Sequence, residues 1–165
     1  MSVVTHSNAL ALLRCLASFA ETLKVLQTAP NLRRVARELG LDLARCGVTY
    51  AEVRWCPSLH REQGLTDRES VSAVAQGLTD AMGAVNKDKT LPQLQLYQIL
   101  TCLRDLGAGE ADKICKLAID CSAHVELRVC GVDLAGNEHA HPPHKFVQVS
   151  THISILAPSR SHVPP

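Results

Sequence analysis

Apolar residues recur along this chain with two different periods, and stretches of the two periods alternate. Spacings of three and four residues predict four amphipathic helices, at residues 8–27, 30–46, 66–84 and 110–124. Shorter runs rich in β-branched and aromatic side chains predict three strands, at residues 48–55, 93–104 and 128–132. The order α-α-β-α-β-α-β is typical of an α/β protein, in which right-handed βαβ units build a parallel sheet.

Local signals mark the ends of several of these elements. Thr28 is a candidate cap for the second helix, with Pro30 in its first turn, and Gly47 follows that helix where a left-handed residue is usual. Thr66 and Glu69 have the spacing of a capping box at the start of the third helix.

The third strand breaks off into a short acidic segment that contains glycine. Its apolar run ends at Val132, and Asp133, Gly136, Asn137 and Glu138 follow at once. Ligands of α/β proteins bind at the carboxyl ends of parallel strands, where glycine lets the backbone approach a ligand and carboxylates supply acceptors. We therefore expect a site in this segment, and a plain polar turn is the alternative.

Charged side chains also stand near the ends of the other two strands. Alternation places Tyr50, Glu52 and Arg54 on one face of the first strand, and Arg104 ends the second. Because the strands are expected to be parallel, these groups should converge with Asp133 at one edge of the sheet. Buried ion pairing is the alternative role for Arg54 and Arg104.

Composition narrows the class of protein. The 165 residues suit one domain, and 46% hydrophobic and 20% charged residues are typical of a globular protein. The net charge of +1 gives no electrostatic case for nucleic acid, and no apolar run is long enough to span a membrane. The sequence begins without a signal-peptide pattern, and its seven cysteines include no C-x-x-C pair, which favours a reducing, cytoplasmic location.

Six ordered segments resemble the adenosine deaminase family. They are Tyr50-Ala-Glu-Val-Arg-Trp-Cys-Pro57, Leu59-His60, Gly64-Leu-Thr66, Gln76-Gly-Leu78, Ile99-Leu-Thr-Cys-Leu-Arg104 and Gly131-Val-Asp-Leu-Ala-Gly-Asn-Glu138. The resemblance covers about residues 16–146. We therefore expect an irregular start at residues 1–15 that leads into the first helix, a partial deaminase-like domain at 16–146, and a divergent, disordered tail at 147–165.

The resemblance implies a fold and a chemistry. The family is a zinc-dependent (β/α)8 barrel that hydrolyses the 6-amino group of adenosine to give inosine and ammonia, and this chain corresponds to roughly strands two to four with their helices. Gly136 matches the family's glycine whose backbone amide contacts the purine ring. Asp133, Asn137 and Glu138 match the same loop, where the resemblance implies pocket roles rather than metal ligation.

The chain departs from the family pattern at the metal ligands. No H-x-H pair precedes Tyr50, where His6 stands alone, and no H-A-G-E-like block or late Asp-Asp pair follows Glu138. Zinc-generated nucleophiles depend on these ligands, so we expect the chain to be inactive by itself. The alternative is a non-catalytic, truncated product whose open half-barrel is covered by a protein partner or a full-length homologue.

A histidine cluster offers one further metal hypothesis. His139, His141 and His144 include an H-x-H spacing that metal sites use, but they follow the strand of Asp133 instead of preceding Tyr50. The two prolines between them stiffen the segment, and only Glu138 stands near to complete a ligand set. A solvated loop is the expected role, with a small metal-binding module as the alternative. His60 is likewise expected to be a loop residue.

Overall fold

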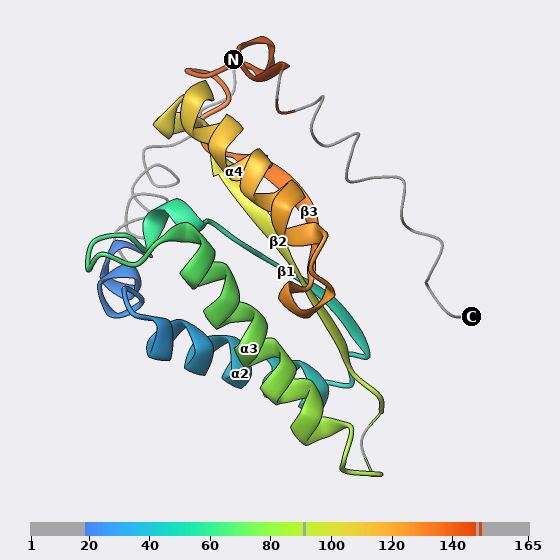
Figure 1. Ribbon diagram of the computed structural model, residues 1–165. Coiled ribbons are helices and arrows are strands. Elements are labelled where there is room, and N and C mark those ends of the chain that lie inside the picture. The colour runs from blue at the N-terminus through green and yellow to red at the C-terminus, as the bar shows by residue number, and fades with distance from the viewer. Residues whose placement is uncertain (1–18, 91, 148, 150–165) are drawn as a thin grey trace, which may run out of the picture.

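The computed structural model describes residues 19–90, 92–147 and 149 (Figure 1). The predicted irregular start at residues 1–15 lies outside these ranges, as does the predicted tail apart from residues 147 and 149. Of the first predicted helix, residues 19–25 are described and helical.

Three parallel strands form the sheet, in the order β1-β2-β3. Their bounds are Tyr50–Trp55 for β1, Gln95–Leu103 for β2 and Val129–Ala135 for β3. The helices are α2 at Ala29–Arg45, α3 at Asp67–Val85 and α4 at Ala108–Ser122. Short 3-10 turns occur at Pro57–Leu59, Arg104–Leu106, Val125–Leu127 and Pro143–Phe146. The alternating α/β order is confirmed, with ends that differ from the expected ones by a few residues.

All three helices pack against one face of the sheet (Figure 1). On that face Leu96, Leu100 and Cys102 of β2 are fully buried. The strand register pairs Arg54 with Ile99 and Thr101 with Asp133, so these four side chains share the opposite face. The expected placing of Tyr50, Glu52 and Arg54 on one face of β1 is confirmed, since the alternate residues Ala51, Val53 and Trp55 pack against the core.

The buried stripe of α2 differs from the expected one. Val35 and Leu39 belong to the apolar three-and-four spacing that predicts this helix, yet they are 45% and 39% exposed. A narrower stripe packs on α3, made by Leu32, Ala36, Gly40 and Ala44. Glycines bring the two helices close, because a Cβ at Gly40 would lie 2.5 Å from Cβ of Ala81. At so close an approach only the residues directly between the helices are covered.

Two further observations bear on the expectations from composition. Within the described ranges, no helix has the length and apolar character to cross a membrane. The six cysteines in those ranges are all free thiols, and four of them are buried: Cys56, Cys102, Cys115 and Cys121.

Candidate functional site

The segments that follow β2 and β3 meet at the carboxyl edge of the sheet. Asp105 lies in the turn after β2, and its Oδ2 accepts a hydrogen bond from the backbone N–H of Asn137, 3.3 Å away, in the loop after β3. Oδ1 of Asn137 in turn accepts from the N–H of Ala140 at 3.1 Å. Asn137 therefore shapes the loop with both its backbone and its side chain.

Gly136 occupies a position that only glycine suits. Its φ is 110°, in the region that side chains disfavour. A Cβ there would collide with Oδ2 of Asp105 and lie 3.3 Å from the backbone nitrogen of Arg104. The missing side chain thus lets two loops from neighbouring strands come into direct contact.

Asp133 lies two residues before the end of β3, on the face opposite the helices. Nε of Arg54 lies 2.9 Å from its Oδ2, an ion-pair distance that spans the intervening strand β2. The alignment is not that of a hydrogen bond, and Oδ2 accepts none from the described residues although it is buried. The charge of Asp133 is partnered while one of its lone-pair directions is left open.

Glu138 lies near a second arginine, Arg104. Nη2 of Arg104 lies 3.8 Å from Oε2 of Glu138, and Nη1 donates to the carbonyl oxygen of His141 at 3.0 Å. The guanidinium of Arg104 also lies over the ring of Phe146, 5.6 Å from its centroid. The Arg104 side chain is only 9% exposed, whereas that of Glu138 is 65% exposed. Arg104 therefore anchors the segment after β3, and Glu138 stays open to solvent.

The three histidines of this segment do not assemble a metal site. His139 and His144 are exposed, and Nε2 of His141 lies 4.0 Å from Oδ1 of Asp105. Among residues 19–90, 92–147 and 149, no three His, Cys, Asp or Glu side chains come together in a way that could hold a metal ion. The described residues do not fit a zinc ion, which ordinarily has three or four such ligands.

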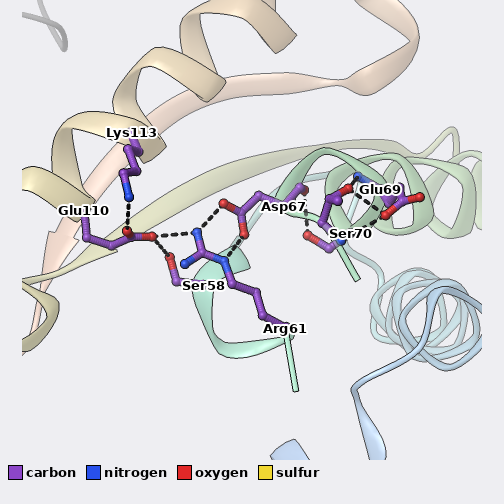
Figure 2. Close-up of polar contacts among 8 residues, drawn as sticks. Ser58, Arg61, Asp67, Glu69, Ser70, Glu110 and Lys113 are labelled. Atoms are coloured by element: carbon purple, nitrogen blue, oxygen red, sulfur yellow. Dashed lines mark hydrogen bonds and ion pairs between the residues drawn. The ribbon is translucent and has the colours of Figure 1, made fainter. Parts of the chain in front are cut away.

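A polar cluster ties the loop after β1 to the start of α4, at the same edge of the sheet. Figure 2 shows Arg61 between Asp67 and Glu110, with Nη2 of Arg61 2.6 Å from Oε1 of Glu110. Ser58 Oγ donates to the same oxygen at 3.0 Å. Burial would raise the pKa of Glu110, but the hydrogen bonds from Arg61 and Ser58 outweigh it and lower that pKa. Glu110 is therefore a structural anion.

His60 has a structural role in the same loop. It is 5% exposed, and its Nδ1 lies 2.6 Å from the carbonyl oxygen of Leu26. Its ring packs against Trp55, and burial lowers its pKa below the usual value. The imidazole therefore joins the chain before α2 to the loop after β1.

Two polar residues of β2 were not singled out from the sequence. Gln98 is fully buried, and its side chain bonds Trp55, Val71 and Leu127 across the core. Thr101 is 4% exposed, and its Oγ1 has no hydrogen-bond partner among the described residues. Both lie in a strand of apolar and β-branched type, where threonine gives no signal of its own.

A cleft of about 410 Å³ lies between α2 and α3. Two of the three arginines that line it are paired: Nε of Arg33 lies 2.7 Å from Asp80, and Nε of Arg34 lies 2.8 Å from Glu38. The two buried polar side-chain atoms that lack a hydrogen bond among the described residues, Oγ1 of Thr101 and Oδ2 of Asp133, lie near the carboxyl ends of β2 and β3 instead, so we take that edge of the sheet as the candidate site.

Most of the chain matches known proteins. The adenosine deaminase family model matches residues 1–157. Adenosine deaminase 1 of Streptomyces coelicolor is 38% identical over 130 residues, which are 79% of this chain and 31% of that protein. Adenosine deaminase of Mycolicibacterium vanbaalenii is 36% identical over 143 residues, 87% of this chain and 38% of that protein.

Solved structures show the same fold. The apo N6-methyl-AMP deaminase of Arabidopsis thaliana aligns with a TM-score of 0.72 at 23% identity, over 87% of this chain and 42% of that one. An amidohydrolase from Burkholderia ambifaria, solved with bound Zn, aligns with a TM-score of 0.59 at 22% identity, over 79% and 33%. The three parallel strands and their helices are part of a (β/α)8 barrel. The chain belongs to the adenosine deaminase family, and it spans about a third of the length of the curated relatives it matches.

Proposed function

We propose that this chain supplies the purine-binding loop of a hydrolytic deaminase, which converts adenosine and water to inosine and ammonia. The observation that carries the proposal is the exposed loop at Gly136, whose lack of a side chain lets the carboxylate of Asp105 and the backbone of Arg104 lie close against it at the carboxyl edge of β3. Membership of the adenosine deaminase family supports the choice of reaction.

The residues of the loop divide between recognition and support. The backbone amide of Gly136 is proposed to contact the purine ring, because nothing but hydrogen stands on its Cα. Asp133 and Glu138 offer carboxylate acceptors beside it. Asn137 holds the loop in shape, since its N–H donates to Asp105 and its Oδ1 accepts from Ala140. A loop fixed before binding loses less entropy when a ligand arrives.

Purine nucleosides and nucleotides are the proposed ligands. The matching curated relatives are adenosine deaminases, and Arabidopsis ADAL, a structural neighbour, has been solved with IMP and with GMP. Adenosine is therefore the first substrate to test, with inosine as the product to which the same loop should bind.

The metal step is not assigned to this chain. Zinc supplies a water of lowered pKa in hydrolytic deaminations, but the described residues offer no ligand set for it. We propose that the chain by itself binds purine nucleosides without turning them over, and that His139, His141 and His144 are loop residues. Buried free thiols support a reducing, cytoplasmic location.

We further propose that another polypeptide packs on the sheet face opposite the helices. Tyr50, which lies on that face, is 50% exposed. Its hydroxyl donates to Glu52 at 2.7 Å, and this bond, followed by burial and the charge of Glu52, raises the pKa of Tyr50 to about 12. Sedimentation of the purified chain would reveal self-association, and a monomer at all concentrations would count against a second copy as the cover.

The proposed function is tested by calorimetric titration of the purified chain with adenosine, inosine and cytidine. Saturable binding of the two purine nucleosides, with cytidine at least about tenfold weaker, is the expected result. Equal binding of cytidine, or no binding of any of the three, would contradict the proposal. Inosine formation from adenosine in the presence of zinc would overturn the claim that the chain alone is inactive.

A further inference from the structure

Thr101 presents a buried hydroxyl that the fold does not use. It lies on β2, two residues before the strand ends, on the face opposite the helices. The residue is 4% exposed, and its Oγ1 makes no hydrogen bond within the described part of the chain. Native structures contain few such groups, and a ligand that completes the hydrogen bond is one of the few physical reasons for them.

The neighbouring strand presents a second open polar atom beside it. Thr101 is in register with Asp133, so their side chains leave adjacent strands on the same face. Oδ2 of Asp133 is buried and also accepts no hydrogen bond from the described residues, although Nε of Arg54 lies 2.9 Å away. Two buried oxygen atoms that lack a hydrogen bond therefore lie on paired residues of adjacent strands, one an ion-paired acceptor and the other able to donate or accept.

The position of the pair connects it to the loop already described. Asp133 precedes Gly136 by three residues, and Thr101 precedes Arg104, which anchors the segment after β3. A ligand seated on Gly136 thus has Thr101 and Asp133 on the sheet face beneath the same edge. Replacing Thr101 with an apolar residue of the same shape would remove a buried group that lacks a hydrogen bond. The stability of the fold therefore does not explain the hydroxyl.

We propose that Thr101 is a substrate-contacting residue, whose hydroxyl acts with Oδ2 of Asp133 to bind a ligand group that both donates and accepts hydrogen bonds. This inference rests on the proposed purine-binding function. The ribose hydroxyls of a nucleoside and the nitrogen edge of a purine base share this chemistry. Thr101 and Asp133 would bind either the ribose or the base, according to which of them lies against the pair.

Thr101→Val tests the proposal, because valine keeps the shape and removes only the hydroxyl. Thr101→Ser keeps the hydroxyl, and Thr79→Val, at an exposed site on α3, controls for the substitution itself. The measurements are the melting temperature without ligand and the dissociation constants for adenosine and adenine. For Thr101→Val we expect an unchanged or raised melting temperature and adenosine binding weakened about tenfold. Thr101→Ser and Thr79→Val should bind adenosine within about twofold of the original chain.

The outcomes separate this inference from the proposed function. Weaker binding of adenosine but not adenine assigns the pair to ribose, and weaker binding of both assigns it to the base. A melting temperature lowered by several degrees in Thr101→Val would mean that the hydroxyl has a structural partner, which overturns the inference. Unchanged adenosine binding would overturn it too while leaving the proposed function in place. Failure of the unaltered chain to bind either ligand would overturn both.

Discussion

Arg54 reaches across the whole of β2 to place its Nε 2.9 Å from Oδ2 of Asp133 on β3. The two strands are not neighbours, so this ion pair links the two edges of the sheet on the face that the helices leave open. The side chain of Arg54 is 58% exposed and that of Asp133 is 33% exposed, which makes the pair a weak contributor to stability. We infer that Arg54 orients the carboxylate of Asp133 for a ligand.

Arg54→Met should therefore affect binding more than folding. Loss of a largely exposed ion pair is expected to lower the free energy of unfolding by less than about 1 kcal/mol. Adenosine binding should weaken severalfold, because Asp133 loses the group that orients it. Arg45→Met, which breaks an exposed pair with Asp42 far from the site, is the control and should leave affinity unchanged. A loss of stability of about 3 kcal/mol or more would instead mark the pair as a structural one.

Gly136→Ala should destabilise the chain and abolish purine binding. The substitution forces a side chain into positive φ and against Asp105, at an expected cost of about 1–3 kcal/mol in the free energy of unfolding. Gly83→Ala is the matched control, since Gly83 lies in α3 with nothing near its Cβ position. That change should stabilise by about 0.5–1 kcal/mol. Denaturant unfolding of both variants measures the two changes in the free energy of unfolding. Equal changes in the two variants would contradict the described loop geometry.

Glu110 should make stability depend on pH in the acid range. Its pKa lies below the ordinary value of 4.5, because hydrogen bonds from Arg61 and Ser58 outweigh its burial. The stabilisation it gives is therefore full above pH about 4.5 and is lost as the pH falls through the lower pKa of the folded state.

The measurement is the difference in unfolding free energy between the original chain and Glu110→Gln. The difference should be constant from pH about 8 to about 6 and shrink below about 4.5. Glu126→Gln, at a side chain that is 68% exposed, should show a much smaller difference throughout. A difference for Glu110→Gln that grows as the pH falls would contradict the assignment of Glu110 as a stabilising anion.

Metal removal should leave the chain unchanged. Since the described residues form no ligand set, a chelator should not alter the melting temperature, and equilibrium dialysis against zinc should find no tightly held ion. His141→Ala should behave as the original chain in both measurements. One equivalent of zinc that is lost on replacing His141 would revive the hypothesis of a small metal module on His139, His141 and His144.

Features governed by local chemistry could be predicted from the sequence. The capping box at the start of α3 is one, since Glu69 N–H donates to Thr66 Oγ1 at 3.2 Å and Thr66 N–H donates back to Glu69 at 2.9 Å. The strands are another, because their apolar runs and bounding turns lie within a few residues of each other. The convergence of Arg54 with Asp133 also followed from strand order and alternation.

Features that depend on residues far apart in the chain could not be predicted. Val35 and Leu39 are exposed because α2 packs closely on α3 where Gly40 lies against Ala81. That contact is visible only in the packed structure. The support of Asn137 by Asp105 joins residues 32 positions apart. Thr101 gives no functional signal in the sequence, because a β-branched residue is common in a strand, and only the missing hydrogen bond in the structure distinguishes it.

The most direct test of the account is to follow the backbone amides of the chain by nuclear magnetic resonance while inosine is added. The signals of Gly136, Asn137, Thr101 and Asp133 are expected to change together along one saturation curve with a single dissociation constant. Movement confined to the cleft between α2 and α3, at Arg33 and Gln76, or no movement at all, would contradict a purine site at the carboxyl edge of the sheet.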